Sequence, residues 1–409
     1  MIRGNRLRRL LGTILLLCIG TGVALISAEV LLRLFPGLLP PDRRAYLEAG
    51  DQSGGVPHPY IGSLHTPNQT WVLTSRDYSV KQTTDEHGFR NRGPWPERAD
   101  IVVLGDSLAF GYGVADNGSW PAILDSSLPD LKVMNFGLVG AGPEQYMRVY
   151  RTFGSQLKPR LVIVGMFTGN DFWDTGMFNR WLRSGVKGNY MYWRDHGRGS
   201  AGVLGAAKRM IGAHSYVYNL ALEARGRLLN RKKDRRTLTL KGGESVQLAI
   251  DEHEQLTAGS VAGSAELASV VGSLSALKAM AEAQDAQLLL VFQPSKEEVY
   301  SPMLGLRVRN SSEALRAELD RMKIRYIDLL PAFREHAKSG EKLYFEVDGH
   351  PNETGYRLIA NSVIAYLKIS RDSFGLPGSQ VESRRRVNWD HRDQTRRFRG
   401  FSHERPYTR

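Results

Sequence analysis

The stretch that decides the fold is Ile-Val-Val-Leu-Gly-Asp-Ser-Leu, residues 101–108. Four apolar residues in succession are typical of a strand buried on both faces, and Gly-Asp-Ser then turns the chain. The turn leaves the hydroxyl of Ser107 at the carboxyl end of the strand, where parallel α/β sheets carry their functional groups. A Gly-Asp-Ser triplet alone is weak evidence for a site, so its meaning depends on partners further along the chain.

From residue 100 onward, short apolar runs alternate with amphipathic stretches. Helix starts are marked by Ser119, by Pro143 and by Asn352, each followed by apolar residues at helical spacing. The alternation predicts an α/β fold, a parallel sheet between two layers of helices. We expect its strands at residues 101–104, 131–136, 161–166, 288–292 and 324–327.

The N-terminus predicts a membrane segment. Residues 1–9 carry four arginines and no acid, and the nineteen residues 10–28 carry no charge. As a helix these nineteen residues would span roughly 28 Å, close to the thickness of the hydrocarbon core. The basic flank favours a single-pass signal anchor in the cytoplasmic membrane, with the rest of the chain facing the periplasm or the exterior. A cleaved signal peptide is the alternative, although no Ala-x-Ala pattern ends the run.

The remaining composition divides the chain and limits its partners. The only cysteine, Cys18, lies in the apolar run, so neither an intramolecular disulfide nor a cysteine-built metal site can form. The net charge of +13 is concentrated at the two ends, which argues against a nucleic-acid-binding core. We expect a basic segment at 1–9, the anchor at 10–28, a spacer and N-terminal extension at 29–95 with a hairpin near 70–84, the α/β domain at 96–370 and a basic tail at 371–409.

Two segments stand apart from this scheme. Residues 175–262 interrupt the alternation, and we interpret them as an insertion beside the active edge, with a helix near 215–229. Their basic run at 231–236 lacks the aromatic residues that would stack on bases. The tail at 371–409 has ten arginines and five acids and few aliphatic residues, which is typical of a solvated extension. Contact of this tail with anionic lipid or an acidic glycan is the alternative interpretation.

A serine nucleophile needs a base, and that base needs an orienting acceptor. His350 is the best candidate among ten histidines, because it lies just before the helix that Asn352 is expected to start. Asp348 is two residues earlier and can reach the ring nitrogen that faces away from Ser107. An Asp-Gly turn leading into a helix is the simpler reading of the same residues.

Ester chemistry also needs donors for the developing oxyanion. The loop after residues 131–136 contains Gly140, whose backbone N–H is free of a hindering side chain. The loop after 161–166 contains Gly169-Asn170-Asp171, where the Asn170 amide is a side-chain donor. Either loop alone could be ordinary turn chemistry, since Gly, Asn and Asp are common turn residues.

Gly105-Asp106-Ser107-Leu108, Gly140, Gly169-Asn170-Asp171 and the Asp348/His350 pair occur in the order of the four blocks of the SGNH (GDSL) hydrolases, which the chain resembles over about residues 88–370. The resemblance implies a flavodoxin-like three-layer fold. It implies Ser107 as nucleophile, His350 as general base and Asp348 as orienting acid. The implied oxyanion hole consists of the Ser107 N–H, the Gly140 N–H and Asn170. No metal or organic cofactor is implied.

The acid departs from the usual family spacing, Asp-x-x-His. One residue separates Asp348 from His350, and Glu346 is a second candidate for the acid. The shorter spacing resembles the branch of alginate and other exopolysaccharide O-acetyltransferases, which has membrane-tethered members.

The function expected from these features is serine-dependent hydrolysis of an O-acylated substrate outside the cytosol. Transfer of the acyl group to an envelope or exported polysaccharide would use the same residues and is the first alternative. A non-catalytic membrane-tethered scaffold is the second.

Overall fold

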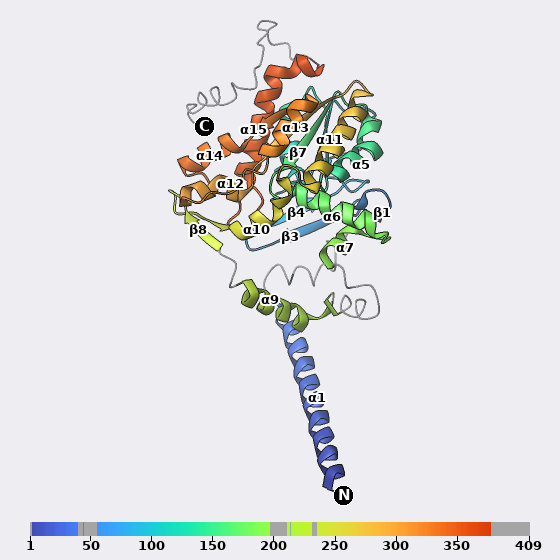
Figure 1. Cartoon of the computed structure of the whole chain (residues 1–409), viewed down its shortest axis with the longest axis vertical. Coiled ribbons are helices and arrows are strands. Elements are labelled where there is room, and N and C mark those ends of the chain that lie inside the picture. Colours follow the sequence, from blue (N-terminus) through green and yellow to red (C-terminus); the bar gives the residue numbers. More distant parts are fainter. Residues whose placement is uncertain are drawn as a thin grey trace.

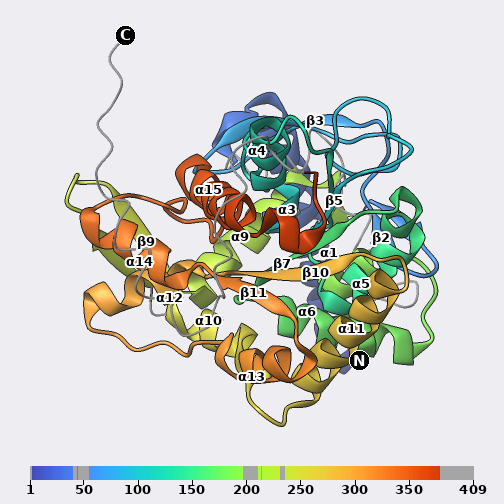
Figure 2. The ribbon, with the colours of Figure 1, turned by 90° about the horizontal axis from the view of Figure 1, so that it is seen from above.

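The computed structural model describes residues 2–39, 44, 55–196, 211–212, 214–230 and 235–377. At its centre is a five-stranded sheet in which all neighbouring strands are parallel, so the predicted α/β fold is confirmed (Figures 1 and 2). The observed strands lie within two residues of the expected ones. They are β5 (Ile101–Gly105), β6 (Val133–Gly137), β7 (Leu161–Phe167), β10 (Gln287–Gln293) and β11 (Arg325–Asp328).

The order of the strands places a crevice at the end of β5. The sheet runs β11-β10-β7-β5-β6, so the chain moves from β5 to β6 on one side and then returns to β7 on the other. The connection after β5 therefore runs to one side of the sheet, and the connection after its neighbour β7 runs to the other. Loops at such a switch point enclose a binding crevice. The turn after β5, which carries Ser107, lies at this point.

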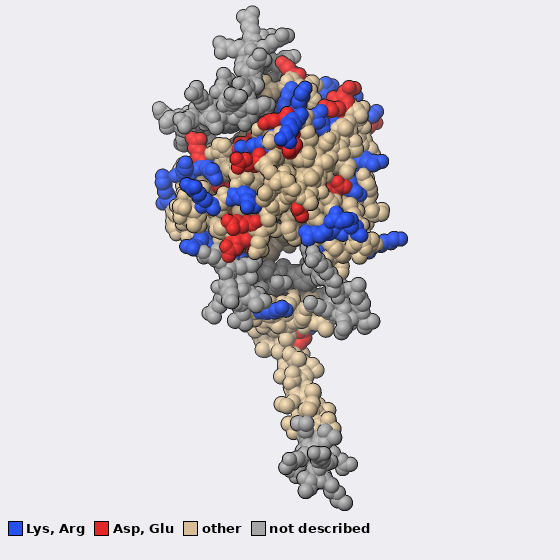
Figure 3. Space-filling model, viewed as in Figure 1, with Lys and Arg blue, Asp and Glu red and all other residues tan. Residues whose placement is uncertain are grey.

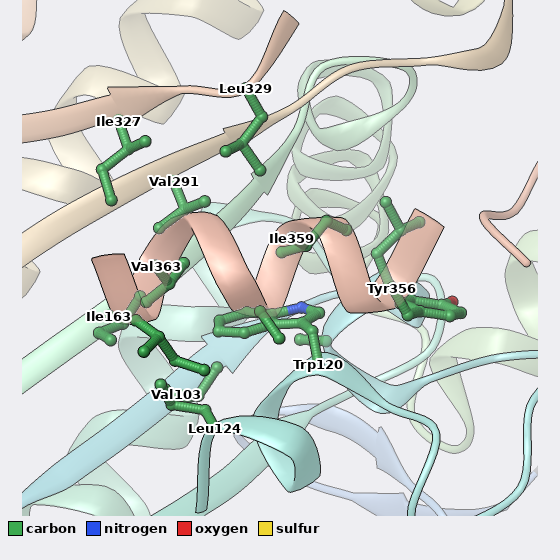
Figure 4. Packing of buried hydrophobic residues seen from close by; sticks show 14 of the residues in the cluster. Val103, Trp120, Leu124, Ile163, Val291, Ile327, Leu329, Tyr356, Ile359 and Val363 are labelled. Atoms are coloured by element: carbon green, nitrogen blue, oxygen red, sulfur yellow. The ribbon is translucent and has the colours of Figure 1, made fainter. Parts of the chain in front are cut away.

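The sheet is largely buried on both faces because its strands consist mostly of apolar residues, with polar residues at Asn135 of β6 and at the ends of β10 and β11. Ile101 and Val103 of β5 face one hydrophobic cluster, while Val102 and Leu104 face the other. In the first cluster Trp120, Tyr356 and Ile359 pack over the sheet (Figure 4). Truncating a fully buried residue such as Ile359 to Ala would cost about 2–5 kcal/mol of unfolding free energy.

Helices cover both faces of the sheet (Figure 2). Ser119 caps α4 and Asn352 caps α15 through their side chains, and Pro143 is the first residue of α5, as the sequence predicted. The first cluster takes residues from α4 (Trp120–Ser127), α12 (Lys296–Tyr300), α14 (Leu330–Ser339) and α15 (Glu353–Ser370). The second takes residues from α5 (Pro143–Thr152), α6 (Asp171–Ser184), α11 (Ala265–Glu282) and α13 (Glu313–Met322).

The N-terminal extension packs on the catalytic domain through two hairpins. Gln82 donates to the carbonyls of Gly111 and Val114, and the buried Arg90 donates to the carbonyls of Phe110 and Gly111. The extension therefore holds the loop that follows the Ser107 turn. Its strands are β1 (Val56–His58), β2 (Gly62–Leu64), β3 (Thr70–Thr74) and β4 (Ser79–Thr83).

The interval 175–262 contains structure of its own. Helix α6 runs through residue 175 and ends at Ser184, so a boundary at 175 would divide a helix. The described elements that follow are α7 (Tyr190–His196), α9 (Tyr216–Asn230), the hairpin β8 (Arg235–Thr239) and β9 (Ser245–Ala249), and α10 (Ile250–Leu256). Of the basic run 231–236 only Arg235 and Arg236 are described, and residues 378–409 of the tail lie outside the described residues.

Short 3-10 helices are η1 (Pro36–Leu38), η2 (Gly154–Leu157), η3 (Ala258–Ser260), η4 (Ser301–Leu304) and η5 (Arg371–Phe374).

A long helix, α1 (Ile2–Leu34), stands away from the domain (Figure 1). Its stretch Leu11–Leu34 is long and apolar enough to cross a membrane, and none of the window that meets this test is buried. In the space-filling view its described part is almost free of charged atoms on the visible face (Figure 3). The helix fits a membrane anchor, and N-terminal signal sequences have the same length and composition.

Candidate active site

Ser107 is the first residue of the short helix α3 (Ser107–Phe110), directly after β5. The preceding Asp106 caps this helix, because its carboxylate accepts from the backbone N–H of Leu108 at 2.8 Å. Burial raises the pKa of Asp106 to about 6, although the hydrogen bond from Leu108 opposes the shift. The cap fixes the turn and leaves the Ser107 hydroxyl pointing to the edge of the sheet.

Three side chains form a continuous hydrogen-bonded chain at that edge. His350 Nε2 lies 2.8 Å from Ser107 Oγ, and His350 Nδ1 lies 2.5 Å from Asp348 Oδ1. The same Asp348 oxygen accepts the backbone N–H of His350 at 2.8 Å, which fixes the two-residue turn between them. The structure thus brings together residues that are 243 positions apart in the chain.

The electrostatics match a base and its orienting acid. Burial by itself would raise the pKa of Asp348, but the charge of His350 and the hydrogen bonds from His350 and Tyr78 hold that pKa well below its usual value. Burial opposes charging of His350, while the carboxylate of Asp348 raises the pKa of the imidazole above its usual value. Asp348 is therefore ionised wherever His350 is neutral and able to accept a proton.

The acid that contacts the imidazole is Asp348. Among the described residues Glu346 reaches this region through its backbone carbonyl, which accepts from Lys296 and from Gln247. Asp348 also has a second partner that the sequence did not indicate: the Tyr78 hydroxyl donates to Oδ2 at 2.7 Å. Burial and the nearby charge of Asp348 raise the pKa of Tyr78, so the phenol keeps the proton that it donates.

The loop that carries the acid is held from two sides. Lys296, at the start of α12, is 1% exposed, and its Nζ lies 2.9–3.3 Å from the carbonyls of four successive residues, 345–348. Asp77, in the turn between β3 and β4, accepts the backbone N–H groups of Val347 and Asp348 at 3.0 and 2.7 Å. The ring of Tyr112 lies 4.7 Å from that of His350.

Sequence reasoning missed Lys296, Asp77 and Tyr78. Lys296 carried a usable signal, because a polar residue three positions after a buried strand is placed at the active edge by the same rule that selected Ser107. Asp77 and Tyr78 carried none, since their turn lies almost 30 residues before Ser107 and its docking on the loop is purely tertiary.

Two of the three expected oxyanion donors, Gly140 and Asn170, lie in the loops after β6 and β7. Gly140 has φ +67°, and a Cβ there would fall 2.0 Å from the Arg194 guanidinium, so the position requires glycine. Arg194 in turn donates to the Gly140 carbonyl and to Asp174, both at 3.1 Å. Asn170 precedes α6 without capping it, and its Oδ1 is buried with no hydrogen-bond partner in the described part of the chain.

A cavity of about 260 Å³ opens beside His350. Asn170, Lys296 and Gly349 line the side formed by the central sheet. The other side comes from the interval 175–262, from β8, β9 and α10, and its lining residues include Arg235, Gln247, Leu248, Glu252, His253 and Leu256. His253 is buried; its Nδ1 lies 3.2 Å from Ser295 Oγ, and its Nε2 has no partner among the described residues.

A family model described as GDSL-like lipase/acylhydrolase matches residues 103–358, which contain the serine, the histidine and the acid. The chain belongs to this family. GDSL hydrolases cleave esters, so esterase activity follows at the level of the family. No curated protein sequence matches the chain. No group of three or more His, Cys, Asp or Glu side chains suited to a metal ion occurs in the described ranges.

Solved structures of GDSL proteins are similar to this chain at low identity. One is a member of the lipolytic G-D-S-L family from Veillonella parvula, 17% identical over 65% of this chain and 96% of its own, with a TM-score of 0.34. Another is an acetylxylan esterase from Geobacillus stearothermophilus, 13% identical over 70% of this chain and 97% of its own, with a TM-score of 0.34. Membership of the family rests on the match over residues 103–358.

Proposed function

We propose that this chain is a serine ester hydrolase in which Ser107 is the nucleophile, His350 the general base and Asp348 the acid that orients it. The observation that carries the proposal is the unbroken chain of hydrogen bonds from Ser107 Oγ through both nitrogens of His350 to Asp348. It lies at the topological switch point of the sheet, where the open edge admits a substrate.

The reaction proceeds in two halves. His350 takes the proton of Ser107 as Oγ attacks the acyl carbonyl, and the Ser107 N–H, the Gly140 N–H and the Asn170 amide stabilise the oxyanion. The imidazolium then gives its proton to the leaving alcohol, which leaves an acyl group on Ser107. A water molecule, deprotonated by His350, attacks the acyl-enzyme and releases the carboxylic acid and free Ser107.

The proposed membrane anchor has its own support. The α1 helix has a four-arginine N-terminal flank and an uncharged run, which favours an uncleaved anchor with the catalytic domain outside the cytosol. Glu29 and Arg33, at the end of α1, also contact residues 214–217, more than 180 positions later. A helix that is part of the folded protein is more consistent with retention than with removal.

Acyl transfer is the second candidate, and the cavity beside His350 favours it. Its charged and amide side chains, Arg235, Gln247 and Glu252 among them, suit a polyhydroxylated acceptor better than an aliphatic chain. An acceptor hydroxyl bound there would replace water in the second half of the reaction.

A fluorophosphonate probe and a p-nitrophenyl acetate assay test the assignment on the same preparations. Wild-type protein should be labelled and active, while Ser107→Ala should lose both properties and His350→Ala should lose at least about 10³-fold in kcat/KM. Full activity of Ser107→Ala would overturn the proposal.

A second assay supplies an acetylated donor with and without a glycan acceptor. Acetylated glycan as the product indicates transfer, and free acetate indicates hydrolysis.

A further inference from the structure

Helix α9 is bound to the C-terminal end of α1 through one carboxylate. Glu29 Oε1 accepts the backbone N–H of Tyr216 at 3.1 Å, and Oε2 accepts the N–H of Val217 at 2.9 Å and the hydroxyl of Ser215 at 3.0 Å. The first N–H groups of a helix have no partner within the helix. Glu29 therefore supplies the cap of α9 from a distant part of the chain.

Arg33 completes the junction on the next turn of α1. Its Nε donates to Glu29 Oε1 at 3.0 Å, its Nη2 donates to the carbonyl of His214 at 2.8 Å, and its guanidinium lies 5.2 Å from the ring centre of Tyr216. Figure 1 shows the result, with α9 lying across the end of α1. We call Glu29, Arg33 and residues 214–217 the α1–α9 latch.

An apolar groove of about 890 Å³ runs beside the latch. Leu25, Ile26 and Val30 supply one wall from α1, while Ile211, Val217 and Ala221 supply the other. Leu220 of α9 lies outside the groove lining and is 38% exposed, so the apolar surface continues past the groove. The wall from α1 belongs to the stretch Leu11–Leu34, so the groove is continuous with the helix surface that would face lipid.

We propose that α9 docks on the membrane surface, with the interfacial region of the bilayer as its partner, and that the α1–α9 latch holds it there. The inference rests on the proposed insertion of α1. Glu29 lies five residues before the end of Leu11–Leu34, about 8 Å along a helix, so an inserted α1 places the N-terminus of α9 near the headgroups. Tyr216, Tyr218 and Arg33 are the aromatic and basic residues that such a depth favours.

Docking of α9 also fixes where the active site opens. Asn230 ends α9 and Arg235, five residues later, lines the cavity beside His350. Five residues span at most about 18 Å. The mouth of the site is thereby kept close to the bilayer surface, where it meets acyl esters carried by lipids or by membrane-attached polymers.

Fluorescent probes on the full-length protein test the docking. In a Cys18→Ser background, Leu220→Cys and the control Ile369→Cys, 60% exposed on α15, are labelled with an environment-sensitive dye. The proteins are reconstituted in vesicles of phosphatidylethanolamine and phosphatidylglycerol that carry a nitroxide near the headgroup. We expect at least twofold stronger quenching at position 220 than at 369. Equal quenching at the two positions overturns the proposal.

Further measurements test insertion of α1, the α1–α9 latch and ester hydrolysis separately. A dye on native Cys18 reports insertion of α1, and a Cys18 dye without quenching by a deep nitroxide overturns the anchor and the docking with it. Glu29→Ala should lower quenching at 220 to the level at 369 with Cys18 quenching intact, whereas Glu282→Ala, which removes a surface carboxylate, should change neither. Unchanged quenching at 220 in Glu29→Ala overturns the latch. Hydrolysis of soluble p-nitrophenyl acetate is followed in parallel, so a failed esterase proposal is distinguished from failed docking.

Discussion

The acid-loop side of the cleft around His350 and the rest of the cleft lining differ in how completely their polar atoms are paired. On the side of the acid loop, Lys296, Asp77 and Tyr78 bond the backbone and the carboxylate of Asp348. In the rest of the lining, Asn170 Oδ1 in the loop after β7 and His253 Nε2 in α10 are buried with no hydrogen-bond partner among the described residues. A paired side is preorganised, and unpaired buried groups are costly unless a ligand or water satisfies them. We therefore expect the acid-loop side to orient the base and the rest of the lining to contact the substrate.

The largest effect should come from removing the charge at the centre of the paired side. Asp348→Asn keeps the shape of the side chain but leaves Nδ1 of His350 facing an amide, which disfavours the tautomer that accepts the proton of Ser107. We expect kcat/KM for p-nitrophenyl acetate to fall about 10³- to 10⁴-fold. The matched control Glu346→Gln should change it less than about twofold. A larger loss in Glu346→Gln than in Asp348→Asn would transfer the orienting role to Glu346.

Asn170 tests the rest of the cleft lining. Asn170→Ala removes a proposed oxyanion donor, a loss that costs about 10²- to 10³-fold in kcat in other acyl-transfer enzymes. The exposed Asn117→Ala is the control on the same domain. Because the amide would act on the transition state, we expect the fall in kcat with little change in KM. A rise in KM with unchanged kcat would instead place Asn170 in substrate binding.

Much of this architecture could be predicted from sequence because it follows local rules. The strands consist mostly of apolar residues, and the helices α4, α5 and α15 begin at Ser119, Pro143 and Asn352 as their capping chemistry predicts. Ser107 and Asn170 could be selected because polar residues that follow buried strands gather at one edge of a parallel sheet, and His350 because it lies just before the last helix with Asp348 two residues earlier.

The contacts that the sequence did not predict depend on tertiary packing. The hairpin of β8 and β9 begins within a basic run that resembles a solvated surface, yet Val246 and Leu248 of β9 are fully buried in the core. Asp77 and Tyr78 lie in a turn between two short strands, and only the docking of that turn on residues 347–348 gives them a place at the site. No residue spacing encodes such a contact.

Replacement of Lys296 tests how much the acid-loop side of the cleft contributes to stability. Lys296→Met keeps the length of the side chain but leaves four backbone carbonyls without their shared donor. We expect the free energy of unfolding to fall by about 2–4 kcal/mol and kcat/KM to fall about tenfold. Denaturant melts of the vesicle-free, detergent-solubilised chain would measure the first quantity. The surface Lys278→Met, which loses only a helical ion pair with Glu282, should cost less than about 0.5 kcal/mol. Equal costs for the two variants would show that the buried ammonium does not hold the loop.

The smallest effect separates a positioning role of Tyr78 from mere packing. Tyr78→Phe removes the donor to Asp348 Oδ2 and leaves the ring beside Phe345. Without this donor, the negative charge of Asp348 is stabilised less by Tyr78 and interacts more strongly with His350. The other titratable groups near the pair, Asp106, Lys296 and Tyr112, are unchanged.

The sign of the resulting pH dependence is determined by His350, which must be neutral to accept a proton. Its pKa is already raised by Asp348, so activity is lost as the pH falls through a value above the ordinary one for histidine. Loss of the Tyr78 hydrogen bond to Asp348 should raise the pKa of His350 further. The acidic limb of kcat/KM in Tyr78→Phe should therefore move up by a few tenths of a pH unit. The maximum should fall several-fold, because Asp348 is less firmly oriented. Tyr60→Phe, which removes a hydroxyl 3.4 Å from Arg151, should leave the limb in place. A lower maximum with an unmoved limb in Tyr78→Phe would reduce Tyr78 to a packing residue and limit the bracing of the acid to Lys296 and Asp77.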